Sequence, residues 1–365
     1  MDIDPSDPDA NGDVSSDCNG NFSPDECDLP HILTMLSTES ENLSENFGGN
    51  VAIDGEYAFA GATGDEENGP DSGRVHVFHY DGVNWMPMQN LSASDAASGF
   101  YFGTAISVAD DTAFIGASSA TSGNGSFGGA VYVFKVNGGV WQETAKLTAS
   151  DAQNGDSFGI CLSLSDDVLA IAATRDDDLG NDSGSAYLFQ RIEDAWVQVA
   201  KIKPNDGAAG DGFGQGISIS DGVLAVGAPY DDDLGNGSGS VYVFEQVLGV
   251  WQQTAKIIPF NGKSFDNFGA SIGLHSGGLL VGSPGDDDAS AEAGAVFIYQ
   301  ENTTGWQQVE KLAAQPSRPG SRLGNSITCS AGLSLIGASS ENVQGQASAR
   351  LTCLACPGKH GTKLR

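Results

Sequence analysis

Residues 213–229 read FGQGISISDGVLAVGAP, two short apolar runs on either side of Asp221 and Gly222. An Asp-Gly pair in this position is a strong hairpin signal, because a two-residue turn requires positive φ values that these residues tolerate. The chain continues with an acidic loop, SVYVFEQ at 240–246, a turn at Gly249 and WQQTAKI at 251–257. This unit therefore predicts four short strands joined as an antiparallel meander.

The same unit recurs with a period of about 55 residues along most of the chain. Its first mark is a Phe-Gly pair at residues 47, 102, 158, 213 and 268, with Leu323-Gly324 as the sixth copy. Its second is a small-residue triplet that starts at Gly61, Gly116, Ala172, Gly227, Gly282 and Gly337. A Trp series at 85, 141, 196, 251 and 306 keeps the same phase. Repeated four-stranded units predict an all-β fold, a six-bladed β-propeller, with seven blades as the alternative.

The repeated Phe, Gly and Trp residues are interpreted as packing residues rather than as ligand-stacking residues. Gly beside Phe lets neighbouring sheets approach closely while the ring fills the space between them.

Ring closure is predicted from the N-terminal side. A Leu or Ile stands eleven residues before each later Phe-Gly mark, and Leu36 stands eleven before Phe47. Residues 31–37 therefore resemble a fourth strand without its first three, and the sixth unit has no fourth strand of its own. We expect this strand to complete the last blade. The predicted domains are an acidic segment at 1–30, a propeller at 31–354 and an irregular tail at 355–365.

The charge balance limits the classes of partner. With 48 acidic and 16 basic residues the net charge is -32, which repels nucleic acid and anionic membrane surfaces and attracts cations. No run of eighteen apolar residues occurs, so membrane insertion through a helix is excluded. Acidic residues rather than a basic and then apolar segment follow Met1, so we expect an extracellular or cell-surface protein whose signal peptide is not in this chain.

The marks at 213–229 resemble the FG-GAP repeat of integrin α-subunit headpieces, and the similarity extends from residue 31 to about 352. The resemblance implies an N-terminally closed propeller, cell adhesion or ligand capture, and calcium held in loops between the two marks. Those calcium loops carry Asp-x-Asp-x-Asp-Gly-x-x-Asp, whereas this chain has only turns such as Ser220-Asp221-Gly222. The calcium sites of the family therefore cannot be transferred.

Acidic residues collect in the predicted loops between second and third strands, with more in the links between units. The loop residues are Asp65, Glu66 and Glu67; Asp176, Asp177 and Asp178; Asp231, Asp232 and Asp233; and Asp286, Asp287 and Asp288. Because lysines are few, one hypothesis is that these carboxylates form a Ca²⁺ site. The alternative is a solvated acidic rim that keeps the protein soluble. The loop at 119–129 carries no acid, and the last link carries Arg318 and Arg322 instead.

A second candidate Ca²⁺ site lies in the N-terminal segment. Oxygen-bearing side chains alternate there as in calcium loops, at Asp7, Asp9, Asn11 and Asp13, and again at Asp17, Asn19, Asn21, Asp25 and Asp28. The second run, flanked by Cys18 and Cys27, resembles a thrombospondin type 3 repeat. The alternative interpretation is a disordered acidic linker.

No catalytic constellation is found, since the five histidines fall at unrelated repeat positions and no nucleophile elbow, phosphate loop or His-Glu-x-x-His motif occurs. We therefore expect a non-enzymatic binding or adhesion module with a protein or glycan partner. The alternatives are a propeller enzyme of the polysaccharide lyase or phospholipase type and a purely structural surface component.

Overall fold

The computed structural model describes residues 45–275, 277–313, 318–330, 333–343 and 346–355. These residues form six antiparallel sheets, numbered 1 to 6 in chain order, and contain no α-helix. Sheet 1 contains β1 (Phe47–Asp54), β2 (Tyr57–Ala62), β3 (Arg74–Tyr80) and β4 (Trp85–Leu91). Sheet 2 contains β5 (Phe102–Ala109), β6 (Thr112–Ala117), β7 (Ala130–Asn137) and β8 (Val140–Leu147). Sheet 3 contains β9 (Phe158–Ser165), β10 (Val168–Ala173), β11 (Ser185–Ile192) and β12 (Ala195–Ile202).

The remaining sheets repeat this order, except that the last has three strands. Sheet 4 contains β13 (Ile217–Ser220), β14 (Val223–Ala228), β15 (Ser240–Val247) and β16 (Val250–Ile257). Sheet 5 contains β17 (Ser271–His275), β18 (Gly278–Ser283), β19 (Ala295–Asn302) and β20 (Gly305–Ala313). Sheet 6 contains β21 (Leu323–Ser330), β22 (Leu333–Val343) and β23 (Gln346–Ala355). β23 ends one residue beyond the predicted domain boundary at 354, and the predicted N-terminal segment lies outside the described residues.

Each sheet is a meander in which consecutive strands pair antiparallel. The quoted stretch forms the predicted hairpin: Ser220 pairs with Val223 across a turn whose central residues have φ values of 50° at Asp221 and 79° at Gly222. Positive φ at both positions matches the twist of the flanking strands, which explains the Asp-Gly choice.

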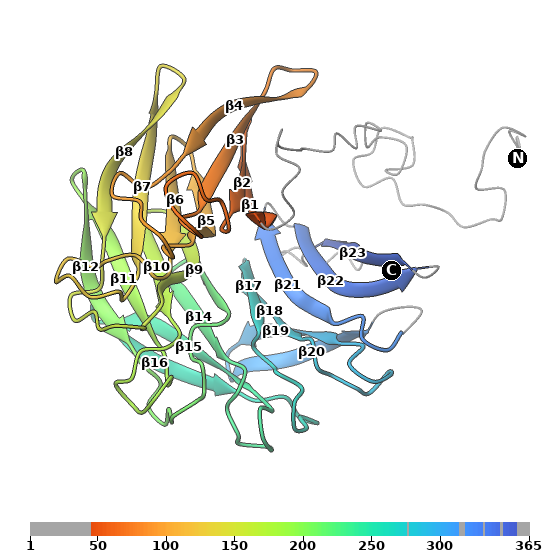
Figure 1. Cartoon of the computed structure of the whole chain (residues 1–365). Coiled ribbons are helices and arrows are strands. Elements are labelled where there is room, and N and C mark those ends of the chain that lie inside the picture. Colours follow the sequence, from red (N-terminus) through yellow and green to blue (C-terminus); the bar gives the residue numbers. More distant parts are fainter. Residues whose placement is uncertain (1–44, 276, 314–317, 331–332, 344–345, 356–365) are drawn as a thin grey trace, which may run out of the picture.

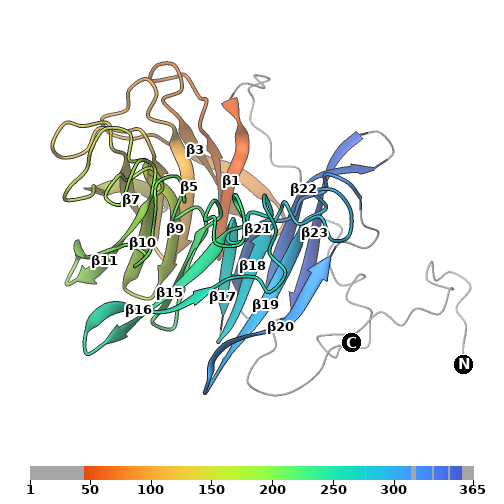
Figure 2. The same ribbon diagram turned by 90° about the horizontal axis from the view of Figure 1, so that it is seen from below.

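The sheets succeed one another around a common axis, and β16 and β20 lie at the outside of the molecule in both views (Figures 1 and 2). The first strands of all six sheets line one axial cavity of about 310 Å³. Corresponding residues contribute from each sheet, among them Val51, Ile106, Leu162, Ile217, Ile272 and Ile327. This arrangement is that of a β-propeller.

The two repeat marks contact each other across the junctions between sheets. A Cβ atom on Gly103 of β5 would lie 3.2 Å from the Cα of Gly61 in β2, and one on Gly269 would lie 3.2 Å from the Cα of Gly227. The Phe side chains beside these glycines, Phe102 and Phe268, are fully buried. Phe-Gly and the small-residue triplet therefore recur together because each is the other's packing partner in the adjacent sheet.

Two residues of the Trp series, Trp141 and Trp196, also pack between sheets. The ring of Trp141 on β8 lies 5.1 Å from that of Phe59 in sheet 1, and the ring of Trp196 on β12 lies 4.9 Å from that of Phe114 in sheet 2. Both pairs are edge-to-face, the geometry that aromatic quadrupoles favour. Packing roles predicted for these residues agree with their positions.

The junction between sheet 6 and sheet 1 differs from the others. Ile272 and Leu274 of β17 are buried against sheet 4, whereas the corresponding Val51 and Ile53 of β1 are 69% and 66% exposed. Sheet 6 also lacks a fourth strand among the described residues. Residues 31–37, predicted to supply that strand, lie outside the described part of the chain.

Candidate functional site

One face of the propeller is built from two kinds of segment: the loops between second and third strands, and the links from each sheet to the next. At all five junctions the backbone N–H of a link residue three before the Phe-Gly mark, or its Leu-Gly equivalent in sheet 6, donates to a carbonyl of the preceding sheet's loop. The pairs are Gly99–Pro70, Gly155–Phe127, Gly210–Asn181, Phe265–Asn236 and Gly320–Ala291. These bonds hold loops and links at fixed positions, so we call this surface the loop face.

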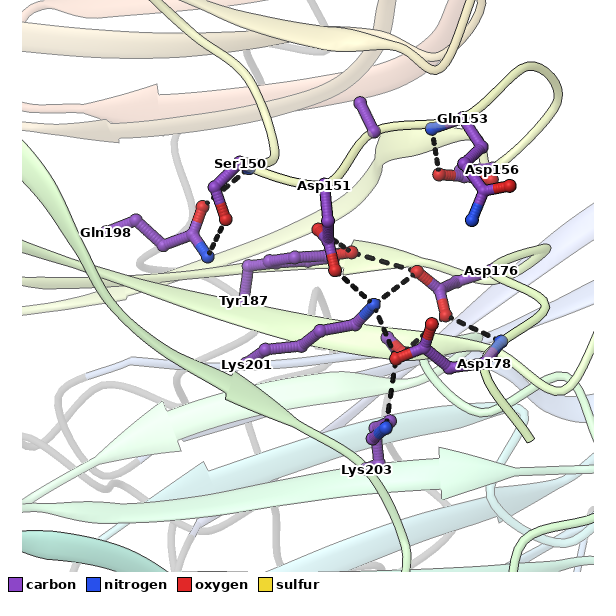
Figure 3. Close-up of polar contacts among 12 residues, drawn as sticks. Ser150, Asp151, Gln153, Asp156, Asp176, Asp178, Tyr187, Gln198, Lys201 and Lys203 are labelled. Carbon is purple, nitrogen blue, oxygen red and sulfur yellow. Dashed lines mark hydrogen bonds and ion pairs between the residues drawn. The ribbon is translucent and has the colours of Figure 1, made fainter.

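The first acid of each acidic loop is buried rather than solvated. Asp176 in sheet 3 is the clearest case (Figure 3). Its carboxylate accepts hydrogen bonds from the Tyr187 hydroxyl at 2.9 Å, the Lys201 ammonium at 2.8 Å, the Ser185 hydroxyl at 2.9 Å and the Asp178 N–H at 3.1 Å. A buried carboxylate is tolerated when its oxygens are paired in this way. Asp176 therefore stabilises the loop from inside.

Lys201 lies at the centre of three carboxylates (Figure 3). Oxygens of Asp151, Asp176 and Asp178 lie within 4.8 Å of one another, a spacing that could hold a metal ion. The Lys201 Nζ atom is 2.7, 2.8 and 2.9 Å from these three groups, and it lies 5.2 Å from the centre of the Tyr187 ring. The ammonium thus occupies the position that a cation would take.

Protonation equilibria in this cluster follow from the contacts. Burial favours the neutral amine, but hydrogen bonds to the three carboxylates outweigh it and raise the pKa of Lys201. Burial alone would raise the pKa of Asp151, but the hydrogen bonds from Lys201 and Tyr187 outweigh burial and lower that pKa. Bonds from Lys201 and Lys203 lower the pKa of Asp178. These contacts favour the charged forms of Lys201, Asp151 and Asp178, and the three carboxylates of the cluster outnumber the two ammonium groups beside them.

The same arrangement recurs around the ring. In sheet 4 the Lys256 ammonium lies 2.8 Å from Asp206, 3.1 Å from Asp231 and 2.7 Å from Asp233. In sheet 5 the Lys311 ammonium lies 2.6 Å from both Asp286 and Asp288.

Sheets 1 and 2 vary the arrangement. In sheet 2, whose loop carries no acid, Ala120 is buried at the position of Asp176 and Lys146 lies 2.7 Å from Asp95 of the link. In sheet 1 the cation is Arg74 of β3, which pairs with Asp65 and Glu67. Four of these five cations are lysines at one repeat position: Lys146, Lys201, Lys256 and Lys311.

The lysines at this repeat position in sheets 3 to 5 lie where the acids collect, but two or three carboxylates share each of them, so the carboxylates remain in excess. The second acid of each of these acidic loops also has a partner. Asp177 and Asp232 accept hydrogen bonds from backbone N–H groups of their own loops at 2.8 Å, and Asp287 forms an ion pair with Lys263 at 2.6 Å. A Ca²⁺ ion at the acidic loops would have to displace an ammonium. Ca²⁺ binding there stays a prediction, as it does for the N-terminal acids Asp7 to Asp28, which lie outside the described residues.

A second set of acids lies in the links, two residues before the Phe-Gly mark. Asp156, Asp211 and Asp266 are buried, and each accepts a backbone N–H, at 2.7 Å from Gln153 in the case of Asp156. Burial, with added repulsion from Asp176 and Asp177, raises the pKa of Asp156 from 3.8 to about 6. Burial also raises the pKa of Asp211 and of Asp266.

A groove on the loop face was not found from the sequence. It has a volume of about 730 Å³, and residues of sheets 4, 5 and 6 with the adjoining links line it, including Tyr230, Phe265, Asn267, Asp287, Glu292 and Arg322. We call it the link groove. Arg322, part of the predicted basic notch, pairs with Glu292 at 2.6 Å. The one sequence signal for the groove is Phe265, which stands where the other four links have Gly.

These features define a repeat β-propeller with an internally ion-paired loop face. The FG-GAP repeat model matches residues 41–78, 85–134, 141–189, 196–244 and 251–299, more than half of the chain. The chain therefore belongs to the FG-GAP repeat family. The first match covers β1 to β3, and each of the other four begins in the fourth strand of one sheet and ends in the third strand of the next, so β20 and sheet 6 lie outside the matches. No curated protein matches the chain significantly.

Proposed function

We propose that this chain is an extracellular binding or adhesion module that presents the loop face to a protein or glycan partner. The observation that carries the proposal is the placement of exposed aromatic side chains. In the part of the chain that the structure describes, every exposed Phe, Tyr or Trp lies on this face, in a loop or a link: Tyr101, Phe127, Tyr230, Phe260 and Phe265. Aromatic side chains supply binding energy at interfaces because they bury large areas with little loss of conformational entropy.

The scaffold beneath this face supports the same conclusion. Backbone hydrogen bonds between links and loops hold the face at five junctions, and lysines pair with the acidic clusters below it. A rigid surface loses little entropy on binding.

We further propose six blades, with residues 31–37 as the fourth strand of sheet 6. Two observations support this: the six first strands share one axial cavity, and sheet 6 has three described strands where the others have four. The exposed Val51 and Ile53 mark the junction that closure would cover. The described part of the chain contains no helix able to cross a bilayer.

Any calcium dependence is assigned to the N-terminal acids rather than to the acidic loops, because ammonium groups already occupy the loop positions. Titration calorimetry with Ca²⁺ on the full chain and on a chain lacking residues 1–30 tests this. We expect heat of binding in the first and none in the second. Equal binding in both would return the site to the propeller.

The binding proposal is tested by capture on arrays of immobilised glycans and extracellular proteins, with and without chelator. Capture is expected to fall at least tenfold when Tyr101 and Phe127 are both replaced by Ser, or when Tyr230 and Phe265 are. It is expected to persist in the control variant Leu248→Ser, which alters an exposed apolar residue in the β15–β16 turn, away from the loop face. No capture by the wild type, or release of a product from the array, would contradict a binding role.

A further inference from the structure

Phe265 departs from the repeat in a way that packing does not explain. Gly occupies the corresponding link position at residues 99, 155, 210 and 320, with φ between 75° and 94°. Phe265 has the same conformation, with φ 69°, and donates the same backbone hydrogen bond to a loop carbonyl. A left-handed conformation is unfavourable for a bulky L-residue, so this chain carries backbone strain at one link where four others avoid it.

Burial of the Phe265 ring does not compensate for that strain, since the residue is 65% exposed. At the four corresponding glycines a Cβ atom would meet nothing within 4 Å, so a side chain at this position points away from the protein. The ring is therefore exposed, while the hydrogen bond from the Phe265 N–H to the Asn236 carbonyl fixes the backbone. Backbone strain is found at ligand-contacting residues, and this residue also lines a groove on the loop face.

Gly285 follows the second repeat mark of sheet 5, and a Cβ atom there would collide with the Phe265 carbonyl. Sheet 1 also carries Gly at this position, at Gly64, whereas sheets 2, 3 and 4 carry Ser119, Arg175 and Tyr230. In sheet 5 the backbone of the link therefore fills the space that a side chain would need.

Phe265 and Gly285 both line the link groove, whose volume of about 730 Å³ lies in the range of small-ligand sites. A second ring, Tyr230, lines it and is 49% exposed. Two exposed rings in one concavity suit a ligand with apolar faces.

The polar groups of the groove are compensated or neutral. Asp287 is paired with Lys263 and Glu292 with Arg322, each at 2.6 Å. Gln215 and Asn325 also line this groove, and no hydrogen bond of their side-chain amides is found among the described residues. Amides offer both donors and acceptors, which is what hydroxyl groups require.

We propose that the link groove binds a neutral saccharide, with sugar rings against Phe265 and Tyr230 and hydroxyls on the groove amides. The proposal deepens, and rests on, the binding role proposed above. A sugar combines apolar C–H faces with hydroxyls, matching both sets of groups, while the net charge of -32 disfavours an anionic ligand. A folded protein partner would require a broad contact of about 800 Å² on this chain, and the adaptation here is confined to one groove.

The test uses an array of immobilised neutral oligosaccharides built from hexoses and N-acetylhexosamines, beside an array of peptides. Wild type, Phe265→Gly and Tyr230→Ala are compared with the control Leu248→Ala, which alters a fully exposed apolar side chain in the β15–β16 turn, away from the loop face. Phe265→Gly restores the residue of the other links, so its melting temperature should not fall. We expect at least tenfold weaker saccharide capture by both groove variants and unchanged capture by the control.

The other outcomes overturn the proposal in distinguishable ways. If saccharides are captured equally by wild type and both groove variants, the groove is not the site, and the binding role stands. If only peptides are captured, the saccharide class is wrong, and the binding role again stands. If wild type captures nothing on either array or on the protein arrays described above, the binding role fails together with this inference.

Discussion

Lys201 shows at the level of a single residue how the loop face is held together. Its ammonium contacts three carboxylates that come from a link and an acidic loop, and it also lies over the Tyr187 ring. Since Asp176 is buried, its charge depends on this partner. Removing one member of a buried ion pair is costly because the other charge remains without compensation.

We therefore predict that Lys201→Met lowers the free energy of unfolding by about 3 kcal/mol, measured by chemical denaturation. The matched control is Lys203→Met, which removes a more exposed lysine that contacts only Asp178 and should cost less than about 1 kcal/mol. Millimolar Ca²⁺ should raise the melting temperature of Lys201→Met more than that of wild type, because the vacated centre offers three carboxylates. Equal responses to Ca²⁺ would show that the ammonium does not occupy a cation position.

Asp156 links stability to pH through its raised pKa. In the folded protein it binds a proton near pH 6, but in the unfolded chain only near 3.8. Between these values the folded state holds more protons, so this group makes the fold more stable as the pH falls from 7 towards 4. Asp151, Asp178 and Asp288 have lowered pKa values and act oppositely, with stability lost below about pH 4.

The variant Asp156→Asn should reduce the gain in melting temperature between pH 7 and pH 5 by about 1–3 °C. The amide oxygen of Asn can still accept the Gln153 N–H, so the loop geometry is retained. Differential scanning calorimetry at several pH values measures the effect, with Asp110→Asn, in an exposed turn, as the control. An unchanged pH profile would show that Asp156 titrates normally.

At the level of elements, the junctions between sheets depend on a further set of glycines that lie outside the Phe-Gly pairs and the small-residue triplets. The residue before the third strand of sheets 1 to 5 is Gly at 73, 129, 184, 239 and 294, and at each a Cβ atom would collide with the backbone of the Phe or Leu in the next sheet's first repeat mark. The backbone of one blade therefore rests directly on that of its neighbour. Their regular spacing is a signal that could have identified these residues from the sequence.

Gly239→Ala is predicted to destabilise the protein by about 2–4 kcal/mol, because the added methyl group meets the Phe268 backbone and the φ value of 85° is strained for Ala. Gly222→Ala is the matched control: its φ is 79°, but nothing lies within 4 Å of the added atom. It should cost only about 1 kcal/mol. Equal losses of unfolding free energy in the two variants would mean that the junction can move apart.

The whole molecule depends on how the ring closes. Val51 and Ile53 face the junction with sheet 6 and are exposed among the described residues, whereas their counterparts in sheets 4 and 5 are buried. A fourth strand on sheet 6 would make the junction between sheets 6 and 1 more similar to the other junctions.

Deletion of residues 1–38 is accordingly predicted to lower the melting temperature by more than about 5 °C, because it removes the proposed closing strand. Deletion of residues 1–30 keeps that strand and removes only the acidic segment, so it should leave the melting temperature in the absence of Ca²⁺ unchanged. If the longer deletion is as stable as wild type, residues 31–37 do not close the ring.

The sequence alone determined the repeat, its four strands and its hairpin turns, because these depend on neighbours a few residues apart and on a regular period. It also placed the acids on one face. It did not reveal that Lys201 lies among Asp151, Asp176 and Asp178, since these partners are 23 to 50 residues from it and meet only when the sheet, its loop and the preceding link pack together.

The link groove likewise required the tertiary structure. Phe265 differs from the glycines of the other links in the sequence, but its outward orientation and its proximity to Tyr230 and Arg322 depend on three successive sheets stacking around the axis. Local patterns determined the blade. The long-range packing of blades decided which acids are neutralised and where a ligand-sized space remains, because both depend on side chains contributed by different parts of the ring.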